Sequence, residues 1–383
     1  MPEYVTTVNR VVMAERTGYG LNGIMHTESK STMSSSVPVS PTGHLTPRND
    51  WLSQHREEIL APDLPIVDPH HHLVGRDDTG VYLLPELLAD INSGHRITAT
   101  VYLEWLSMYR STGPAAMRPV GEVEFANGIA AMAASGTYSK TRVCDGIVGY
   151  ADLAFGAAVE QVLEAQIIAG GGIGGRFKGI RYISATHPDQ MAWGAAIQRP
   201  EGMLADAAVR EGFAKLAVHG LSFDAWCYHT QLDELIARVY PDVPIVLNHV
   251  GGAIGLGRYA GKRDEVFVSW CARIEELAQC PNAYIKLGGL GMRMFGFDVH
   301  EQAQPPSSSA LATVWRPYIE TCIAAFGAER AMFESNFPVD KGSGSYQVFW
   351  NTFKRIAADY SPSEKSALFS GTASRFYRLS QPQ

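Results

Sequence analysis

The stretch Leu64-Pro65-Ile66-Val67-Asp68-Pro69-His70-His71-His72-Leu73 decides how the rest of this chain is interpreted. Its apolar first part predicts a buried β-strand, which ends in an Asp and three histidines. Because successive strand residues point to opposite faces, His70 and His72 share one side and His71 faces the other. Two imidazoles spaced in this way form half of a chelate for a metal such as zinc. The alternative is a polar loop whose histidines only form hydrogen bonds.

The composition is that of a globular protein and excludes several classes of partner. The 383 residues suffice for one large α/β barrel or two medium domains. The net charge of −7 gives no electrostatic reason to bind nucleic acid or anionic membranes. The 5 cysteines are scattered without a CxxC pair, which indicates reduced thiols. We find neither a membrane-spanning apolar run nor a signal pattern, so we expect a cytoplasmic protein.

The first residues differ in composition from the remainder of the chain. Residues 27–46 are rich in Ser, Thr and Pro and poor in apolar side chains. Such a composition cannot form a packed core of its own. We therefore predict a flexible N-terminal extension over residues 1–48, dispensable for catalysis, and a single catalytic domain over residues 49–383.

From residue 64 onward, short apolar runs alternate with helical patterns such as residues 120–134, 265–279 and 346–358. The apolar runs lack clean alternation, which is typical of parallel strands buried on both faces. Eight strand–helix units in this order predict a (β/α)8 TIM barrel, and an open doubly wound sheet is the alternative. The predicted strands are residues 64–68, 97–104, 145–152, 177–183, 221–228, 244–248, 283–287 and 331–335.

In a TIM barrel, the functional residues lie where the strands end and point inward. Histidines follow the first, fifth and sixth predicted strands, which is a distribution that a mononuclear metal hydrolase would show. Two long connections, residues 106–118 and 289–309, lie on the same side and suggest a shaped pocket. The candidate site residues are His70, His72, Glu104, Tyr109, Arg181, His229, His249, Lys286, Glu334 and Asn336.

These motifs together resemble the amidohydrolase superfamily, in the branch that includes sugar-acid lactonases and the 2-pyrone-4,6-dicarboxylate lactonase. The resemblance covers about residues 62–380. It implies a TIM barrel with a hydrolytic site, but it does not specify the substrate, because this barrel hosts many reactions. The matching segments are Asp68-Pro69-His70-His71-His72-Leu73, Phe223-Asp224, Ile245-Val246-Leu247-Asn248-His249-Val250-Gly251, Lys286-Leu287 and Glu334-Ser335-Asn336-Phe337-Pro338.

The eighth strand departs from the superfamily pattern, which usually ends in Gly-Ser-Asp. Here the triplet is Glu334-Ser335-Asn336. The usual Asp acts as the general base, and Asn cannot accept a proton at neutral pH. Three outcomes follow: Glu334 is the base, another carboxylate such as Glu104 or Asp340 is the base, or hydrolysis has been lost.

We expect hydrolysis of a lactone, or of a related ester or amide, by attack of an activated water on a carbonyl. His229, His249, Glu334 and Asn336 are the expected catalytic residues. His70, His72 and His229 are the expected ligands of a divalent metal, zinc by preference, with metal-free hydrolysis as the alternative. The expected substrate contacts come from Arg181, Glu104, Tyr109 and Lys286.

The substrate is expected to be a small molecule, and a carboxylated lactone would suit the planar fork of Arg181. Arg181 could equally be a structural charge inside the barrel. The alternative function is metal-dependent non-oxidative decarboxylation of an aromatic or unsaturated acid. A binding protein without catalysis is a third hypothesis, and the sequence leaves a homo-oligomer open.

Overall fold

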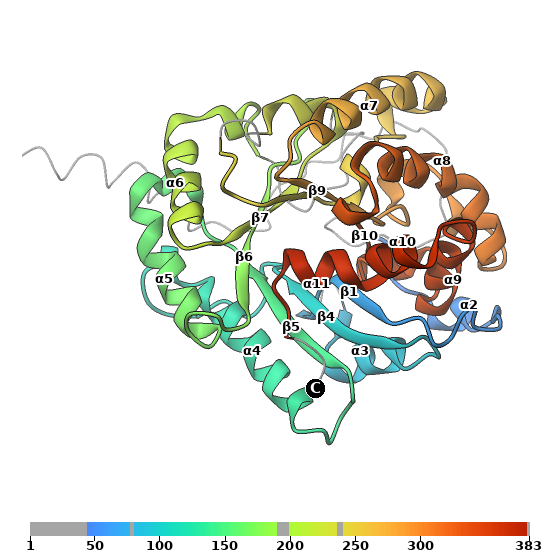
Figure 1. The fold of residues 1–383 in the computed structure, drawn as a ribbon, viewed down its shortest axis with the longest axis horizontal. Coiled ribbons are helices and arrows are strands. Elements are labelled where there is room, and N and C mark those ends of the chain that lie inside the picture. The colour runs from blue at the N-terminus through green and yellow to red at the C-terminus, as the bar shows by residue number, and fades with distance from the viewer. Residues whose placement is uncertain (1–43, 77–79, 190–198, 236–239, 381–383) are drawn as a thin grey trace, which may run out of the picture. The chain divides into compact units, whose positions relative to one another are not determined.

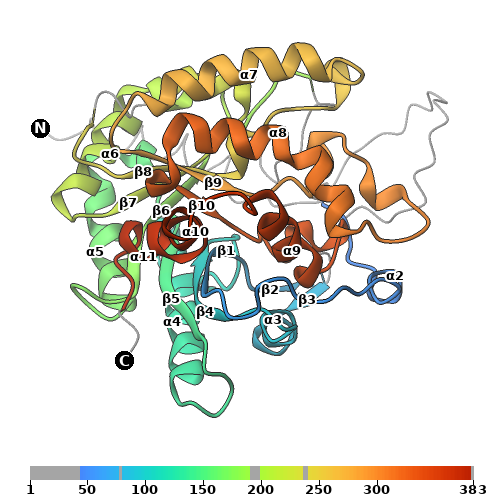
Figure 2. The same cartoon turned by 45° about the vertical axis from the view of Figure 1, so that its right-hand side comes forward.

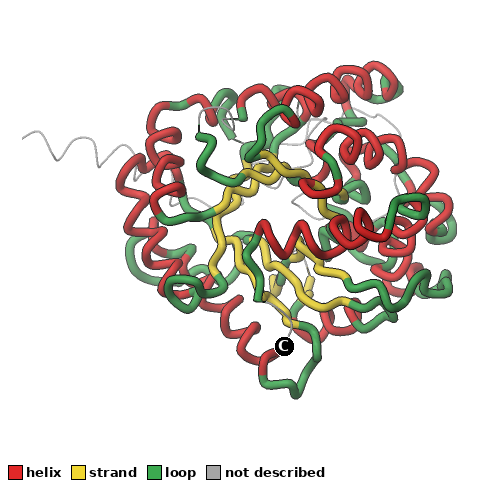
Figure 3. The backbone as a smooth tube through the Cα atoms, viewed as in Figure 1, coloured by secondary structure: helices red, strands yellow, loops and turns green. Residues whose placement is uncertain are grey.

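The computed structural model describes residues 44–76, 80–189, 199–235 and 240–380. Eight parallel strands form one sheet in the order β1-β4-β5-β6-β7-β8-β9-β10, drawn as the ring of strands in Figures 1 and 3. The strands are β1 (Ile66–His71), β4 (Ile97–Leu103), β5 (Arg142–Gly149), β6 (Phe177–Ile183), β7 (Ser222–Trp226), β8 (Ile245–Leu247), β9 (Ala283–Leu287) and β10 (Ala331–Phe333).

Backbone contacts between the first and last strands close this sheet into a barrel. His71 forms a parallel bridge with Phe337, just beyond the end of β10. The amide of His72 donates to the carbonyl of Phe337 at 2.8 Å, and the amide of Asn336 donates to the carbonyl of His70 at 3.0 Å. The (β/α)8 barrel predicted from the sequence is therefore confirmed, and the open sheet is excluded.

Helices surround the strands and alternate with them along the chain. Figure 2 shows α7 and α8 side by side over the β9 part of the barrel. Among the residues described, none of the helices has both the length and the apolarity needed to cross a membrane. The helices are α2 (Asn49–Leu52), α3 (Leu84–Ile91), α4 (Val120–Ala134), α5 (Glu160–Ala169), α6 (Ala207–Val218), α7 (Arg263–Ala278), α8 (Ser308–Phe326), α9 (Tyr346–Ile356), α10 (Pro362–Ser366) and α11 (Thr372–Phe376).

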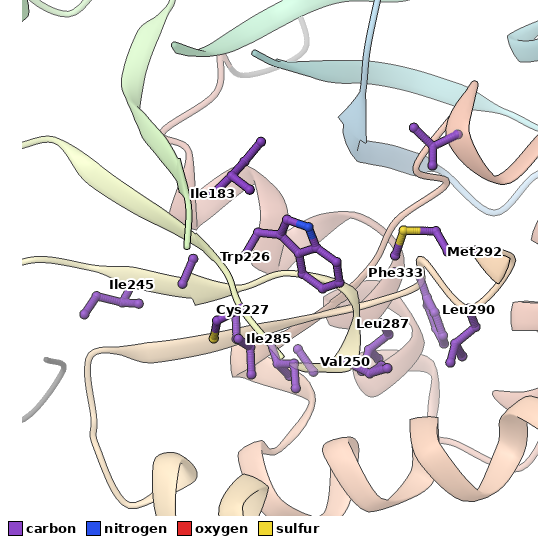
Figure 4. Close-up of a cluster of buried hydrophobic side chains, with 14 of the residues drawn as sticks. Ile183, Trp226, Cys227, Ile245, Val250, Ile285, Leu287, Leu290, Met292 and Phe333 are labelled. Atoms are coloured by element: carbon purple, nitrogen blue, oxygen red, sulfur yellow. The ribbon is translucent and has the colours of Figure 1, made fainter. Parts of the chain in front are cut away.

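Two layers of apolar side chains hold the barrel together. Outward strand residues such as Ile180, Phe223 and Leu247 form one large core with the surrounding helices. Figure 4 shows part of this core, where Trp226 at the end of β7 lies among buried apolar side chains that include Ile183 and Met292. The alternation of inward and outward residues is what places polar groups inside the barrel and apolar groups beneath the helices.

The C-terminal residues fill the interior at the end where the strands begin. Ala373, Phe376 and Tyr377 of α11 and the residue after it pack against inward residues such as Val101 and Val246. Figure 1 shows α11 crossing the ring of strands. This end is therefore closed by apolar packing, and the polar groups inside the barrel face the opposite end, where the strands terminate.

A short hairpin is inserted between β1 and α3, and the sequence analysis did not anticipate it. β2 (Val74–Arg76) pairs in antiparallel fashion with β3 (Gly80–Tyr82). With only three residues in each strand, these segments are too short to show a period of two. The hairpin lies directly after the histidine motif and so stands beside the site.

The packed body includes residues that we predicted to belong to a flexible extension. Leu45 is only 5% exposed, and it lies so close to Gly342 that a Cβ on this glycine would come within 2.3 Å of it. Arg48 donates to the carbonyl of His300 at 2.6 Å, and Trp51 donates to that of Gln302 at 3.1 Å. Packing therefore begins by residue 44 rather than at residue 49, and the predicted extension over residues 1–43 lies outside the described residues.

Candidate active site

Glu334 lies between two imidazoles where β10 ends. One carboxylate oxygen, Oε2, lies 2.6 Å from His70 Nδ1, and the other, Oε1, lies 2.7 Å from His249 Nδ1. The backbone amide of His249 also donates to Oε1 at 3.1 Å. All three residues are buried. The hydrogen bond to Oε1 assigns the Nδ1 proton of His249 and leaves a lone pair on its Nε2. His70 Nδ1 lies within reach of both the Glu334 carboxylate and the Lys286 ammonium, so its tautomer depends on which of them it pairs with.

His72 completes the cluster with the opposite nitrogen facing inward. Its Nδ1 lies 2.9 Å from the carbonyl of Leu103, so Nδ1 carries the proton and Nε2 carries the lone pair. That Nε2 lies 3.2 Å from Nε2 of His70. At this distance His72 Nε2 accepts a hydrogen bond from His70 when that ring carries its proton on Nε2, and the two nitrogens can share a cation when both carry lone pairs. The structure thus brings His70 and His72 together on the same side, as strand parity requires.

Burial keeps these imidazoles neutral. It lowers the pKa of His70 well below its usual value, and the nearby Lys286 lowers it further. Burial also lowers the pKa of His72 well below its usual value. Burial lowers the pKa of His249 as well, although contact with Glu334 partly opposes the shift. At neutral pH the cluster therefore consists of three uncharged bases around one carboxylate.

Lys286 lies beneath the histidines, at the centre of a buried hydrogen-bond chain. Its Nζ lies 3.2 Å from His70 Nδ1 and donates to Asp224 Oδ1 at 2.7 Å. The same Asp224 oxygen accepts from Tyr377 Oη at 2.8 Å and from Asn248 Nδ2 at 3.2 Å. This chain connects the C-terminal segment to the histidine cluster and fixes a positive charge next to His70.

Arg181 places a second positive charge at the same ring. Its NH1 lies 3.4 Å from His70 Nε2. Its Nε donates to Glu104 Oε1 at 2.8 Å, and its NH2 donates to the carbonyl of Glu104. The side-on edge of the guanidinium, formed by Nε and NH2, is therefore occupied by Glu104. This arrangement favours the structural interpretation of Arg181 over a role in binding a substrate carboxylate.

Asn336 sits where the superfamily usually has its Asp, and a carboxylate lies directly behind it. Asn336 Nδ2 donates to Asp340 Oδ1 at 2.8 Å, and the amide of Gly291 donates to Asp340 Oδ2 at 3.0 Å. Burial raises the pKa of Asp340 well above its usual range. The Asp340 carboxylate is therefore engaged on both oxygens and orients the Asn336 side chain.

Among the described residues, no hydrogen bond or ring contact joins His229 to the cluster. β7 ends at Trp226, two residues before the predicted strand end, so His229 begins a 3-10 helix, His229–Glu234. His229 Nδ1 accepts from the amide of Ile254 at 3.4 Å, and its ring faces Tyr259 at 5.4 Å. Tyr109 lies half-buried in the loop after β4. The early end of β7 explains why the histidine does not reach the inward position.

Two tryptophans take positions beside the histidines that the sequence analysis did not assign. The ring of Trp105 stacks on His72 with centroids 4.6 Å apart and an interplanar angle of 35°. The ring of Trp226 meets His249 edge-on at 4.7 Å. Their aromatic character next to strand ends was the available signal, but an aromatic residue at such a position is equally typical of the core.

Several known proteins are similar in sequence to this chain. The family model described as amidohydrolase matches residues 67–379. The uncharacterized protein y4mH of Sinorhizobium fredii is 34% identical over 341 residues, which span 83% of this chain and 99% of the relative. An L-fucono-1,5-lactonase of Burkholderia multivorans is 27% identical over 247 residues, which span 62% of this chain and 72% of the lactonase.

Solved structures share the fold. An amidohydrolase from Burkholderia multivorans with bound zinc superposes with a TM-score of 0.61 at 22% identity, over 82% of this chain and 99% of that one. A putative 2-pyrone-4,6-dicarboxylic acid hydrolase from Pseudomonas putida superposes with a TM-score of 0.54 at 14% identity, over 83% and 99%. At these identities the likeness concerns the barrel alone.

Proposed function

This chain belongs to the amidohydrolase family and is an enzyme of that superfamily, and from this premise we propose that it hydrolyses a lactone. The observation that carries the proposal is the Glu334 carboxylate held between His70 and His249 at 2.6 and 2.7 Å. A carboxylate–imidazole pair is the usual device for activating a water molecule. The partial likeness to an L-fucono-1,5-lactonase supports a cyclic ester as the substrate.

In the proposed reaction, His249 accepts the proton of the attacking water. Its Nδ1 is engaged by Glu334, so Nε2 is the nitrogen free to accept a proton. Burial lowers the pKa of His249, which keeps the ring unprotonated before the reaction. Glu334 stabilises the imidazolium that forms, and so acts through His249 instead of touching the water itself. Proton return to the leaving alkoxide then opens the lactone ring.

Arg181 and Lys286 stabilise the negative charge that develops on the carbonyl oxygen. Both cations flank His70, at 3.4 Å from Nε2 and 3.2 Å from Nδ1 respectively. Both are buried and fixed by acidic partners, Glu104 and Asp224. Fixed charges in a buried site stabilise a tetrahedral oxyanion without reorganising during the reaction.

The donor set also fits a divalent metal, which members of this superfamily use. The spacing of 3.2 Å between the Nε2 atoms of His70 and His72 suits two nitrogens that each lie about 2.0–2.1 Å from one zinc ion. His72 Nε2 carries a lone pair because its Nδ1 faces the carbonyl of Leu103, and His70 would offer its Nε2 with its Nδ1 proton directed to Glu334. His70 and His72 would hold the ion, and it would supply Lewis-acid polarisation of the carbonyl.

A second arrangement of ligands is less compatible with the hydrogen bonds. Ligand atoms of His70, His249 and Glu334 also lie within 4.8 Å of one another. A metal bound through the two Nδ1 atoms would displace the protons that Glu334 accepts. Coordination through His70 and His72 leaves these hydrogen bonds in place, so we propose this pair as the zinc ligands.

The proposed substrate is an uncharged lactone, because Glu104 already balances the charge of Arg181 and occupies the side-on edge of its guanidinium. A panel of lactones with and without a carboxylate, followed by acid release in a pH-stat, tests this. Fastest turnover of an uncharged sugar lactone is the expected result. Release of CO2 from an aromatic acid without lactone turnover would favour the decarboxylase instead.

The proposed zinc ligands are tested by metal analysis. The wild type and His72→Ala, both purified without chelators, should show zinc in the wild type only.

A further inference from the structure

A cavity of about 200 Å³ lies beside the histidine cluster. We call it the rim cavity, and its walls include His44, Leu45, Val81, Tyr82, Trp105 and Val339. It touches the cluster through Trp105, whose ring stacks on His72 at 4.6 Å. Two other wall residues, Val74 and Pro338, each follow a cluster residue by two positions in the chain, His72 and Asn336.

The outer wall of the rim cavity is formed by residues that precede the barrel. The ring of His44 lies 5.0 Å from that of Trp105. Leu45 is buried against Gly342, and the hydrogen bonds of Arg48 and Trp51 to the carbonyls of His300 and Gln302 fasten this segment to the loop after β9. The wall is thus a built part of the molecule, although it lies outside residues 67–379, which the family model matches.

The charges around the rim cavity are already satisfied by the protein. Lys341 donates to Asp90 Oδ2 at 2.7 Å, and Tyr82 Oη donates to the same oxygen at 2.7 Å. Glu86 accepts from the amide of Leu83 at 2.8 Å. The lining also contains the polar side chains of His44, Thr46 and Asn49, together with Trp105 and apolar side chains such as Leu45 and Val81. Such a mixed lining suits an uncharged, hydroxylated ring that packs on an aromatic side chain.

We propose that the rim cavity binds the hydroxylated side of a lactone ring, and that Trp105 and the His44–Leu45 wall determine which lactones are accepted. The inference rests on the proposed function and extends it to substrate selection. About 200 Å³ is less than the roughly 300–1,000 Å³ of a site for a drug-sized ligand, so the cavity holds one pyranose-sized ring. The carbonyl side of the ring would then have to extend past the edge of Trp105 to reach the histidines.

The test compares two lactones in the same variants. D-glucono-1,5-lactone carries hydroxyl groups that would reach the rim cavity, and δ-valerolactone is the bare ring. His44→Ala removes part of the wall, and Val81→Trp fills the cavity from a residue that is 64% exposed. Val268→Trp on α7, at a residue that is 70% exposed, is the matched control.

We expect both wall variants to lower the ratio of kcat/KM for gluconolactone over valerolactone by about tenfold, chiefly through KM, because a lost ring contact is worth roughly that factor. Val268→Trp should leave the ratio at the wild-type value. A general loss of fold would lower both substrates together. An unchanged ratio in both wall variants would overturn the inference while leaving the lactonase proposal intact.

A binding measurement separates failure of the inference from failure of the proposed function. The ring compound 1,5-anhydroglucitol has no carbonyl to hydrolyse, and calorimetry can follow its binding. If the wild type hydrolyses neither lactone but binds this compound, and Val81→Trp abolishes that binding, the rim cavity stands and the lactonase proposal fails. If the wild type does not bind this compound and hydrolyses the two lactones with equal kcat/KM, the inference is overturned.

Discussion

Asn336 replaces the acid that usually ends the eighth strand, and its surroundings show why an acid would be unfavourable here. Its Nδ2 donates to Asp340 Oδ1 at 2.8 Å in a buried site. An Asp at this position would bring two carboxylates together, with no cation near them in the hydrogen bonds described. The pKa of Asp340 is already raised well above its usual range by burial.

We therefore predict that Asn336→Asp destabilises the protein and lowers turnover. Losing this buried hydrogen bond should cost on the order of 1–3 kcal/mol in the free energy of unfolding. The double variant Asn336→Asp/Asp340→Asn exchanges donor and acceptor and should recover most of that loss, which denaturant unfolding measures. If the single variant and the wild type have equal free energies of unfolding, the hydrogen bond between Asn336 and Asp340 does not stabilise the protein.

The alternation of strand residues is sufficient to predict which side chains join the histidine cluster, but it does not predict which candidate residues lie elsewhere. His70 lies in β1, and His72 and Glu334 directly follow β1 and β10, so an alternating pattern places them inward, even though the register of β1 with β4 shifts between Asp68 and His71. His229 follows β7 by three residues, and the backbone has by then turned into a 3-10 helix. Trp105 could not be assigned from its sequence alone, because its position depends on Glu122, which accepts from its amide at 2.7 Å.

At the scale of elements, Asp68 fastens β1 to the last strand. Its Oδ1 accepts from the amide of Ser335 at 3.0 Å, and its Oδ2 accepts from Ser335 Oγ at 2.6 Å and Tyr346 Oη at 2.9 Å. Asp68 therefore joins β1, the end of β10 and α9, and it holds the histidine segment through the backbone amide of His70, which donates to Oδ1 at 3.3 Å. These contacts give Asp68 a supporting role.

We predict that Asp68→Ala lowers the free energy of unfolding more than Tyr346→Phe does. The first change leaves several buried donors without an acceptor, at roughly 1–3 kcal/mol each, whereas the second removes one donor. Denaturant unfolding of both variants checks this order of stabilities.

Asp68→Asn should reduce turnover less than His72→Ala does. The reverse order of turnover would place Asp68 in direct contact with the reacting groups.

Glu57 connects the segment before β1 to the start of α8. Its carboxylate accepts from the amide of Ser308 at 2.7 Å and from Asn351 Nδ2 at 3.1 Å. Burial alone would raise the pKa of Glu57, but hydrogen bonds from Ser308, His55 and Asn351 outweigh it and lower the pKa to about 2. The folded state therefore binds this proton more weakly than the unfolded state does.

Because this pKa is lowered, the stabilisation by Glu57 is complete above its usual value of 4.5 and is lost as pH falls toward about 2. We predict that Glu57→Gln is less stable than the wild type at neutral pH and loses less stability across that window. Glu58→Gln, at the exposed neighbouring residue, is the control. Parallel unfolding curves for Glu57→Gln and the wild type across the window would contradict this account.

The elements themselves could be predicted largely from hydrophobic pattern, with errors where a pattern is short. β6 and β9 agree with their predicted bounds, because buried parallel strands appear as continuous apolar runs. β10 stops at Phe333, before the predicted end, because beyond it the chain meets β1 only through isolated contacts of Asn336 and Phe337. The hairpin of β2 and β3 was missed because each strand has three residues.

At the scale of the whole molecule, the barrel is completed from both ends of the described chain. The C-terminal segment fills the interior and places Tyr377 on Asp224, and residues 44–48 stand at the rim near Trp105. Neither contribution could be predicted from sequence periodicity, because both depend on contacts between distant segments, such as Tyr377 with Asp224 and Leu45 with Gly342.

We predict different outcomes for two N-terminal truncations. A chain that starts at residue 44 keeps the wall of the rim cavity and should turn over a sugar lactone within a few-fold of the full-length protein. A chain that starts at residue 49 loses the wall, and its kcat/KM should fall by about tenfold. Steady-state kinetics on both decide, with thermal unfolding as the check on folding. Equal activity of both chains would mean that residues 44–48 have no role in catalysis.

The central claim is that Glu334, through His70 and His249, activates the attack on a lactone carbonyl, and Glu334→Gln tests it most directly. A glutamine can accept from one imidazole but not from both, and it cannot balance an imidazolium. The account predicts a fall in kcat of roughly 10²–10⁴-fold in a pH-stat assay of the best lactone, while Glu329→Gln, at a surface glutamate whose side chain is 70% exposed, keeps the wild-type rate. A Glu334→Gln protein that melts like the wild type and hydrolyses the lactone at the wild-type rate would contradict it.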